Sequence, residues 1–597
     1  MLFFVYYDIN ISMEYALKER IGKPELFVGR KEEMAYFRKW ITNIKEEMSQ
    51  STAILARRKM GKTAILERLF NITFFKNDGV IPFYYEIKET EMWVLDFSKS
   101  FFLTFIYQYI AFKSRDPEYL NINRTSDFDE ALKIAKKEKL GYLSGIIKDA
   151  AQAAAHESID ILWEIAREAP KTIAAGRNEF IVQLIDEFQF FNSMIYWDKT
   201  KTKLADKLAG GYLSTAESKI APLLISGSWV GWLMNLLNMM LPSRFEYHYL
   251  ENMPESEALE MVFKFSQFFD VPVTEETAYL LVQITEGSPF YISSVIRSLC
   301  PNKDIKTIEG LTRTLEFETL NDRGKIKATW MEYIASAFPK INDRNTKNIV
   351  LHLSKYRDRE LTREEILKDL DLHMSDGELE LKLKALVKSD IIKQGATNFD
   401  YQGVQDNIFD KVFRGVYQKE IDHFDLKVIG KEYSEALEKL KSKYNRLLGK
   451  FNYQKGIFAE YIILDQLKYR AKEKNELLKL ITHNLPVDFN FTEYSRVWRY
   501  DTSPEYERCF NVDIFARSKS PGDYSIIGEV KSRDLRKFSK EEVIECERKF
   551  AEVKKIEKID RVVGFIFSRS GFTKEAEDYC REKGIACSDD EKWLEVR

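Results

Sequence analysis

Short apolar runs in the first half of the chain predict the strands of an α/β sheet. They are Thr52–Leu55, Ile81–Ile87, Phe180–Ile185 and Ala221–Ile225. The third run is almost wholly apolar, which is typical of a strand buried on both faces of a parallel sheet. Helical patterns from Trp93 to Lys113 and from Glu138 to Glu168 separate the second run from the third. We expect these helices to cover the sheet, and a role in oligomer contacts stays open.

Residues 340–420 predict a winged helix. A short helix over Leu361–Leu367 is entered through Thr362, and a second, from Ser375 to Ser389, begins with a Ser/Asp cap. The wing strand starts at Ile391–Gln394 and returns through 398–405. Near its N-terminus the second helix carries three acidic residues, Asp376, Glu378 and Glu380, which would repel phosphates. We therefore favour packing against protein over reading of bases.

Alternation returns in the last quarter of the chain. Residues Cys509–Ala516 alternate like a strand, Lys519–Asp523 has turn composition, and Tyr524–Lys531 is a second strand. An antiparallel hairpin would bring Asp513 beside Glu529 and Lys531, which share one side because they are two residues apart.

Composition describes a soluble, multidomain protein. A chain of 597 residues exceeds one core, so three or four domains are expected. The net charge of −3 does not indicate a nucleic-acid binder, although residues 441–597 carry roughly +4. Five scattered cysteines make structural zinc and a disulfide framework unlikely expectations. No apolar stretch reaches the ~20 residues that span a bilayer, and no signal peptide is evident, so we expect a cytoplasmic protein without membrane partners.

The segment Ala56–Thr63 fits the phosphate-binding loop G-x-x-x-x-G-K-[ST], except that Ala56 replaces the first glycine. Successive backbone N–H groups and the start of the next helix can wrap a polyphosphate. Lys62 would reach the β- and γ-phosphates, and Thr63 would hold Mg²⁺. The cofactors expected are therefore ATP and Mg²⁺. The residues expected around the nucleotide are Arg57, Arg58, Lys59, Met60, Gly61, Lys62, Thr63 and Ala64.

Polar residues end two of the predicted strands. Asp186 and Glu187 follow the strand that starts at Phe180, at the carboxyl edge where open α/β sheets bind ligands. Asp186 would hold Mg²⁺ through water, and Glu187 would orient or deprotonate the attacking water. The strand ending at Ile225 leads into Ser226-Gly227-Ser228, and Ser228 could sense the γ-phosphate or position that water.

Residues from about 25 to 299 resemble the archaeal ATPase family, a branch of the P-loop ATPases related to the AAA+ and STAND groups. The matching segments are Phe27–Arg30, Arg57-Arg58, Asp186-Glu187, Ser226–Ser228, Pro242–Arg244 and Thr285–Pro289. The resemblance implies that Val28, Gly29 and Pro289 lie near the adenine and that a helical lid closes over the nucleotide. It also makes Arg244 a candidate for stabilising the γ-phosphate, in its own or a neighbouring subunit.

The C-terminal hairpin carries a second candidate chemistry. Asp513 and Glu529 could bind Mg²⁺, which activates water and stabilises charge on a phosphodiester, while Lys531 orients the water or the phosphate. The D…E-x-K pattern is followed by a helix (Lys540–Lys555), a strand (Val562–Phe567) and a helix (Thr573–Lys583). Over about 450–597 this order resembles the PD-(D/E)XK restriction-endonuclease-like fold. The resemblance implies an extra metal-binding carboxylate, Glu460, on the preceding helix.

The sequence thus predicts an α/β protein with an ATPase core (1–240), a helical lid (241–335), a winged helix (336–425), a helical linker (426–449) and a nuclease-like domain (450–597). The expected function is an ATP-binding, ATP-hydrolysing switch that controls a Mg-dependent nuclease-like domain acting on DNA. The alternative is a regulatory ATPase whose C-terminal domain binds protein or nucleic acid without cutting. A homo-oligomer is an open alternative to a monomer.

Overall fold

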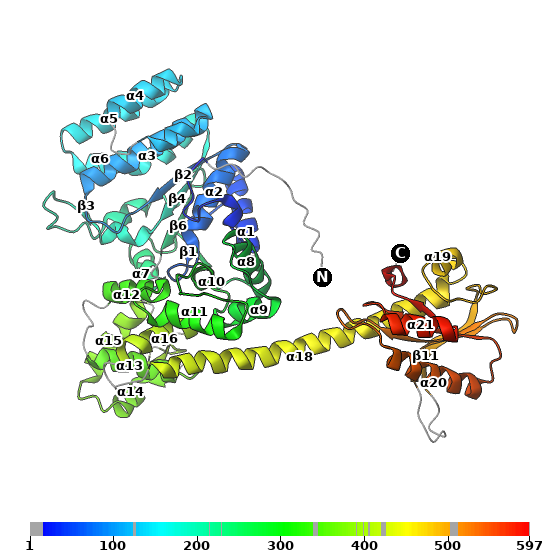
Figure 1. The fold of residues 1–597 in the computed structure, drawn as a ribbon. Helices are drawn as coiled ribbons and strands as arrows, with labels where there is room; N and C mark the ends of the chain where they lie inside the picture. The colour runs from blue at the N-terminus through cyan, green and yellow to red at the C-terminus, as the bar shows by residue number, and fades with distance from the viewer. Residues whose placement is uncertain are drawn as a thin grey trace. The chain divides into compact units, whose positions relative to one another are not determined.

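The protein is seen in a computed structural model that describes residues 16–122, 127–213, 215–227, 230–337, 344–356, 358–389, 391–397, 399–403, 406–418, 426–501 and 511–595. The chain forms two compact units, Met1–Leu440 and Lys441–Arg597 (Figure 1). The division falls inside helix α18 (Lys427–Asp465), so the predicted linker 426–449 is part of a longer helix.

The first unit is built on a parallel five-stranded sheet in the order β2-β4-β6-β1-β7. Its strands are β1 (Thr52–Leu55), β2 (Val80–Glu86), β4 (Phe180–Asp186), β6 (Leu223–Gly227) and β7 (Glu246–Tyr249). The four predicted strands and their parallel arrangement are confirmed. The edge strand β7 was not predicted, because its sequence Glu-Tyr-His-Tyr has no apolar run.

Helices surround this sheet and extend beyond β2 (Figure 1). They include α1 (Lys31–Thr42), α2 (Lys62–Lys76), α3 (Val94–Ser114), α4 (Phe128–Lys137), α5 (Ser144–Ala155), α6 (Ile159–Arg177) and α7 (Val230–Met240). The single helix predicted over Glu138–Glu168 is wrong, since α5 and α6 are separated by a turn in which Glu157 has a φ of +49°. The covering role is confirmed for α3, which packs on β2 and α6.

Aromatic side chains fill the space between β2, α3 and α6. The ring of Phe101 lies 5.1 Å from Phe83 and 5.9 Å from Trp163, in edge-to-face geometry in both pairs. Such pairs contribute about 0.5–1.5 kcal/mol each beyond the burial of their area. Because α3 is buried on nearly all sides, its sequence is apolar around the whole helix rather than along one stripe.

Glu67 on α2 gives the first unit a pH-dependent stability. The side chain is 3% exposed, and burial raises the pKa of Glu67 to about 7 from an ordinary 4.5. The folded state therefore holds the proton more tightly than the unfolded chain, and stability falls as pH rises from 4.5 through 7.

We expect Glu67→Gln to stabilise the first unit by about 1 to 3 kcal/mol at pH 8, because the buried charge is removed. The gain should shrink towards zero as pH falls below 5. The measurement is the urea midpoint of the first unit between pH 4.5 and 8. A gain that is equal at both ends of this range would contradict the prediction.

Beyond the sheet, the first unit continues as helices and a small three-stranded sheet. The helices are α8 (Glu255–Phe268), α9 (Glu275–Ile284), α10 (Pro289–Ile296), α11 (Ile308–Leu320), α12 (Lys325–Ala337), α13 (Arg344–Lys355), α14 (Arg363–Asp369), α15 (Asp376–Lys388) and α16 (Asn407–Phe413). The small sheet has the order β8-β10-β9, with β8 (Leu361–Thr362), β9 (Ile392–Gln394) and β10 (Asp400–Gly403) antiparallel. The two caps predicted at Thr362 and Ser375 are confirmed as capping boxes.

The second unit is a five-stranded mixed sheet in the order β11-β12-β13-β14-β15. Its strands are β11 (Tyr494–Asp501), β12 (Asn511–Ser518), β13 (Ser525–Lys531), β14 (Val562–Ser568) and β15 (Ala586–Ser588). The predicted antiparallel hairpin is confirmed for β12 and β13, and β13 to β15 are parallel. The first two residues of the predicted strand Cys509–Ala516, Cys509 and Phe510, lie outside the described part of the chain.

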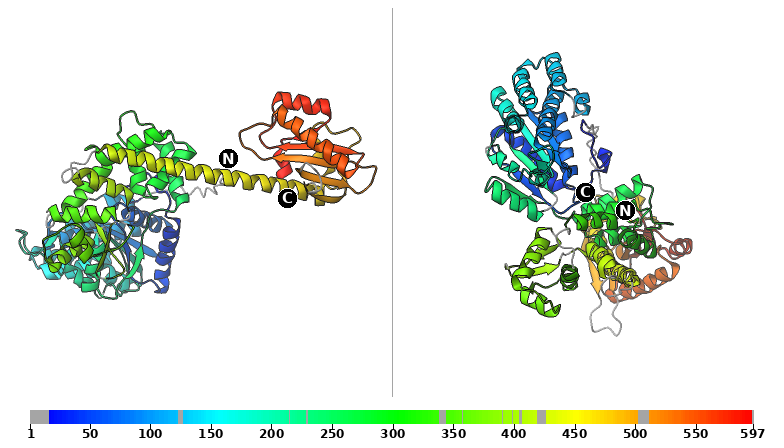
Figure 2. Two further views of the ribbon diagram at one scale, coloured as in Figure 1. Left: turned by 90° about the horizontal axis from the view of Figure 1, so that it is seen from below. Right: turned by 90° about the vertical axis from the view of Figure 1, so that its left-hand side faces the viewer.

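Helices cover both faces of this second sheet (Figure 2). One face packs against the end of α18 and α19 (Asn475–Leu480), with Ile514 and Ala516 turned towards it. The other packs against α20 (Lys540–Glu557) and α21 (Lys574–Lys583), with Phe515 and Ile527 turned towards those helices. The alternation predicted for the hairpin thus serves two cores rather than one.

The described cysteines are buried in both units. Cys300 lies in the first unit. In the second, Cys546 on α20, Cys580 on α21 and Cys587 on β15 belong to one core. Burial raises the pKa of the Cys546 thiol to about 12, so this group is a protonated core residue at neutral pH. Within the described ranges, no helix combines the length and the apolar character that crossing a bilayer requires.

Candidate functional site

The loop between β1 and α2 has the backbone conformation of an anion-binding nest. Lys59 and Gly61 adopt left-handed conformations with φ of +65° and +92°, and α2 begins at Lys62. A Cβ added to Gly61 would meet no atom within 4 Å, so the backbone is open on that side. Ala56 has a negative φ, so replacing the usual glycine causes no backbone strain there.

Side chains from the start of α2 and from the ends of two parallel strands, β4 and β6, meet where this loop ends. The Thr63 hydroxyl donates to Asp186 Oδ2 at 2.6 Å, and the Ser226 hydroxyl donates to Asp186 Oδ1. The Lys62 ammonium is buried and donates to the carbonyl oxygens of Ala56 and Arg57 at 2.8 and 2.9 Å. These contacts join the carboxyl ends of β1, β4 and β6, which lie side by side in the sheet.

Asp186 is fully buried, and this burial raises the pKa of its carboxyl group. Glu187 adds to the rise, while the hydroxyls of Ser226 and Thr63 and the charge of Lys62 oppose it. Glu187 adopts a left-handed conformation with a φ of +55°, and its carboxylate accepts from Gln189 Nε2 at 2.5 Å. The two adjacent carboxylates therefore have different surroundings, one facing Thr63 and the other facing Gln189.

Of two further residues predicted for this site, one lies outside the described residues and the other is placed elsewhere. Ser228 lies outside the described residues, and Ser226 is the serine that contacts Asp186. Arg244 pairs with Glu217 at 2.7 Å. It precedes β7, whose first residue, Glu246, is paired in register with Thr52 at the start of β1. Because β1 and β7 are parallel, Arg244 lies at the edge of the sheet opposite the loop, which excludes a γ-phosphate contact within its own chain in this arrangement.

A cavity of about 380 Å³ lies beside the first half of the loop. It is lined by Arg57–Met60, by Thr285, Glu286, Ser288, Phe290 and Tyr291 of the lid region, and by Trp330, Tyr333 and Asp406 among others. Val28, Gly29 and Pro289 do not line it, although Ser288 and Phe290 on either side of Pro289 do. A volume of this size lies within the range that small-molecule ligands occupy.

The residues around the loop's arginines connect it to the helices that follow. Arg57 Nη1 lies 3.0 Å from Asp406 Oδ2, and its guanidinium lies 5.2 Å from the ring of Trp330. The hydroxyl of Tyr291 also donates to Asp406 Oδ2, at 2.8 Å. Arg58 pairs with Glu89 at 2.8 Å. One loop is therefore held by residues from α10, α12 and the N-cap of α16.

The segment before α1 is anchored to the same neighbourhood. Gly29 has a φ of +76°, and a Cβ there would lie 2.9 Å from the sulfur of Met253. The guanidinium of Arg30 donates to the carbonyl oxygens of Glu251 at 2.6 Å and Met60 at 3.0 Å. Val28 is buried, Thr63 and Ala64 are half-buried, and Pro289 is the first residue of α10.

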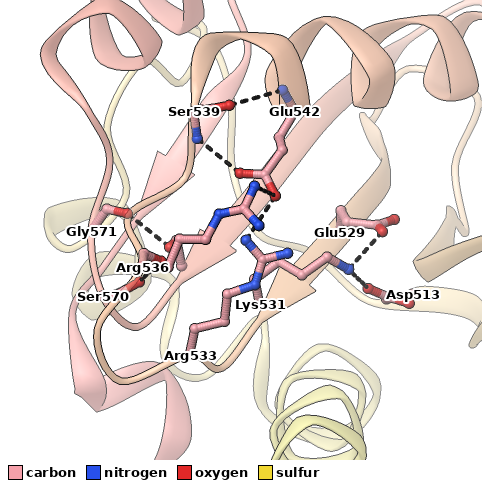
Figure 3. Close-up of polar contacts among 10 residues, drawn as sticks. Asp513, Glu529, Lys531, Arg533, Arg536, Ser539, Glu542, Ser570 and Gly571 are labelled. Carbon is pink, nitrogen blue, oxygen red and sulfur yellow. Dashed lines mark hydrogen bonds and ion pairs between the residues drawn. The ribbon is translucent and has the colours of Figure 1, made fainter. Parts of the chain in front are cut away.

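The second unit holds a separate group of two carboxylates and one lysine on β12 and β13 (Figure 3). Lys531 Nζ lies 2.8 Å from Glu529 Oε1 and 3.5 Å from Asp513 Oδ2. Asp513 Oδ2 also accepts from the backbone N–H of Val530 at 2.9 Å. Burial acts to lower the pKa of Lys531, but the two carboxylates outweigh it and raise the pKa above its usual value. The hairpin thus brings the three predicted residues together.

The donor set of this group fits a hard divalent cation. Glu529 Oε2 is buried and has no hydrogen-bond partner among the described residues, which leaves one carboxylate oxygen for an ion. The predicted third carboxylate, Glu460 on α18, has a pKa raised by burial and then by Asp513, and it pairs with Arg499 at 3.6 Å. As they stand, the described side chains include no cluster of three or more acidic, His or Cys groups that could hold a metal. Asp513 and Glu529, completed by water, are the residues that would bind Mg²⁺.

Several residues at these sites were missed by sequence reasoning. Tyr291, Trp330 and Asp406 are far apart in the chain, and Asp406 on its own is an ordinary N-cap whose side chain accepts from Ile408 and Phe409. Lys549 on α20, 3.7 Å from Glu529, belongs to a helix rich in Lys and Glu throughout. Only the packing of distant segments distinguishes these residues from their neighbours.

Comparison with known proteins gives distant likenesses only. No family model and no curated protein matches the chain. Among solved structures it is similar to a Walker-type ATPase of Pyrococcus abyssi, with 15% identity and a TM-score of 0.42 over 66% of this chain and 97% of that one. It is also similar to the ORC2 protein of Aeropyrum pernix in its ADP form, with 12% identity and a TM-score of 0.31 over 70% of this chain and 96% of that one. A third likeness is to the Holliday junction branch migration motor RuvB of Thermotoga maritima, with 12% identity and a TM-score of 0.30 over 64% of this chain and 93% of that one. TM-scores this low carry no conclusion about the present chain.

Proposed function

We propose that the chain is an ATP-binding and ATP-hydrolysing switch protein that controls a Mg-dependent, nuclease-like domain acting on DNA. The observation that carries the first part is the convergence of Lys62, Thr63, Asp186 and Ser226 at the carboxyl ends of three parallel strands. A basic residue, a hydroxyl and a carboxylate beside an open N–H nest match the chemistry that a nucleoside triphosphate with Mg²⁺ requires.

In the proposed reaction each side chain has a separate task. Lys62 exchanges its two carbonyl acceptors for phosphate oxygens, and the N–H groups around Gly61 bind the same anion. Thr63 and Asp186 would hold Mg²⁺, which would supply positive charge beside the phosphates. Glu187, which directly follows Asp186 at the end of β4, would orient the attacking water. After release of the phosphate, the Lys62 ammonium would again donate to the carbonyl oxygens of Ala56 and Arg57.

The proposed switch depends on the contact between Arg57 and Asp406. Arg57 lines the cavity and lies within the nucleotide loop, whereas Asp406 caps α16, which follows the small three-stranded sheet. A phosphate group that attracts Arg57 would weaken its pairing with Asp406 and with the Trp330 ring. Nucleotide binding would in this way alter how the later helices are held, with Tyr291 retained by Asp406.

We expect Asp406→Asn to bind ATP roughly fivefold more tightly, because a partly buried ion pair of about 1 kcal/mol no longer competes for Arg57. Asparagine keeps one oxygen in the place of Oδ1, which accepts from the backbone N–H groups of Ile408 and Phe409, and its amide nitrogen takes the place of Oδ2, where it can donate to the hydroxyl of Tyr291. The measurement is ATP affinity by calorimetry. Asp410→Asn, on the same helix and paired with Arg414, is the matched control. Unchanged or weaker ATP binding by Asp406→Asn would contradict the proposed coupling.

The proposed nuclease chemistry rests on Asp513, Glu529 and Lys531. The two carboxylates would hold Mg²⁺, which supplies an activated water and stabilises charge on a phosphodiester. Lys531 lies within hydrogen-bond distance of Glu529 and would then turn towards the phosphate or the water. Lys549, also near Glu529, would hold that carboxylate in place.

The second candidate function is a regulatory ATPase whose second unit binds nucleic acid or protein without cutting it. The specific observation in its favour is that two ammonium groups, from Lys531 and Lys549, already neutralise one oxygen of Glu529. A carboxylate paired in this way attracts a metal ion less strongly than a free one. The two functions differ in whether phosphodiester bonds are broken.

The experiment that tests the proposal uses the purified full chain with Mg²⁺ or Mn²⁺. Phosphate release from ATP is measured beside cleavage of single-stranded, duplex and branched DNA, with and without ATP. ATP hydrolysis together with cleavage that changes with ATP supports the proposed function. ATP hydrolysis with no cleavage of any substrate supports the second candidate. Absence of both activities, with ATP still bound, contradicts both.

A further inference from the structure

The middle of α18 has an unusual combination of charge and exposed aromatic side chains. Residues 441–459 include five basic residues, Lys441, Lys443, Arg446, Lys450 and Lys455, and no acidic residue. Large apolar side chains are exposed on the same stretch and just beyond it: Leu447, Leu448, Phe451, Tyr453, Ile457, Phe458 and Tyr461. Apolar side chains exposed in such a cluster indicate a binding surface.

These residues are arranged in rows along the helix. Arg446, Tyr453 and Glu460 are seven residues apart and so share one side, and Tyr453 is 70% exposed. Lys443, Lys450 and Phe458 recur at seven and eight residues on a neighbouring side. Each row therefore contains at least one cation and one aromatic ring.

The first row ends at the carboxylate group of the second unit. Glu460 pairs with Arg499 at 3.6 Å, and the residue after Arg499 on β11, Tyr500, is paired in register with Val512, which precedes Asp513 on β12. Lys455 Nζ lies 3.2 Å from Asp534, three residues after Lys531. Residues 446–460 therefore approach the group formed by Asp513, Glu529 and Lys531 from within the same unit.

A second copy of this helix is a poor occupant for the surface. In a parallel coiled coil with Phe451 and Phe458 in the seam, Lys450 of one helix would face Lys455 of the other. Like charges at these flanking positions oppose pairing. Lys443, Arg446 and Lys450 have no ion-pair partner among the residues that the structure describes, and each is exposed. The complementary partner is a polyanion with flat, stackable faces.

We propose that residues 441–461 of α18 form a binding surface for single-stranded nucleic acid that leads the strand to the Asp513–Glu529 group. The basic side chains would contact phosphates, and unpaired bases would stack on Tyr453 and Phe458, a contact that paired bases in a duplex cannot make. This inference rests on the proposed nuclease function for its last step, delivery to the carboxylates. Binding itself does not depend on that function.

The test measures fluorescence anisotropy of a labelled dT20 oligonucleotide and of a 20-base-pair duplex, with the full chain in EDTA so that no cleavage occurs. We expect dT20 to bind more tightly than the duplex. Tyr453→Ala/Phe458→Ala should weaken dT20 binding by roughly 5- to 150-fold and leave duplex binding nearly unchanged. Lys443→Ala/Lys450→Ala should weaken both and lower the salt slope by about 1 to 2.

The matched control is Lys554→Ala/Lys555→Ala, which removes two exposed lysines from another basic patch of the same unit, at the end of α20. The proposal is overturned if this control loses as much affinity as the α18 variants, or if the aromatic pair has no effect on dT20. All substituted side chains are exposed, and circular dichroism melts would show whether the variants remain folded.

The other occupants give distinct results. Sedimentation with vesicles of phosphatidylglycerol and phosphatidylcholine, without dT20 binding, would overturn the proposal in favour of a membrane surface. A dimer that dissociates on Phe451→Ala/Phe458→Ala would overturn it in favour of a second copy. Tight dT20 binding without cleavage would support the surface and contradict the nuclease. Cleavage of duplex DNA that is unaffected by the α18 variants would support the nuclease and contradict the α18 surface.

Discussion

Replacing Glu529 by glutamine is expected to slow metal-dependent DNA cleavage by about 10³-fold or more, equivalent to about 4 kcal/mol of transition-state stabilisation. Glutamine keeps the size of the side chain but removes the negative charge that would bind Mg²⁺. The buried Oε2 atom has no hydrogen-bond partner among the described residues, so it is the oxygen of Glu529 left to coordinate an ion. Cleavage rates at saturating Mg²⁺ and at saturating Mn²⁺ give the measurement.

Folding must be separated from chemistry in this experiment. Glu529 is 6% exposed and pairs with Lys531 and Lys549, so removing its charge leaves two ammonium groups without this partner and should lower the thermal stability of the second unit. Glu557→Gln, at the far end of α20 and paired with Arg517, is the control for loss of a carboxylate in the same unit. Cleavage by Glu529→Gln at the normal rate would exclude the Asp513–Glu529 group as the catalytic centre.

Replacing Lys62 by alanine is expected to lower ATP hydrolysis by about 100-fold or more, about 2.7 kcal/mol, because the γ-phosphate loses its nearest fixed cation. ATP affinity should fall as well, since Lys62 would contact the phosphate in the ground state too. In the structure its ammonium group is 2.8 Å from the carbonyl of Ala56 and 2.9 Å from that of Arg57. Steady-state phosphate release and equilibrium binding together divide the effect between the two states.

Two further variants define the role of Lys62. Lys76→Ala removes an exposed lysine at the other end of α2 and should leave both ATP constants unchanged. Lys62→Arg keeps the charge but changes its geometry, so it should recover more of the binding than of the hydrolysis. Hydrolysis by Lys62→Ala within twofold of the unmodified rate would show that the loop between β1 and α2 is not the hydrolytic site.

The core strands of both units were predictable because their periodicity is strong and local. Phe180–Asp186 is apolar at almost every position, and Ile514 to Ala516 alternate between two cores. The hairpin register followed from the turn at Lys519–Asp523, and with it the approach of Asp513 to Glu529. The break between α5 and α6 was not predictable in this way, because His156–Ser158 has neither glycine nor proline to mark it.

The candidate sites were predictable where a motif fixes several roles within a few residues. Lys62 and Thr63 lie at one helix start, and the carboxyl edge of a parallel sheet brings Asp186 to them. The position of Arg244 depends instead on which strand β7 pairs with, and the short polar strand gave no indication of that partner. The contacts of Asp406 join segments about 350 residues apart, beyond the reach of any local pattern.

The buried cysteines make local opening of each unit measurable in the native protein. A thiol reagent reacts only with a thiolate that solvent can reach, so labelling reports the transient exposure of a core rather than its average structure. Cys300 would time opening of the first unit, and Cys546, Cys580 and Cys587 that of the second. A Cys509→Ser background would leave only these four reporters. Added ATP that slows labelling of Cys300 alone would show that the nucleotide protects one unit, whereas slowing at all four would reveal energetic coupling along the chain.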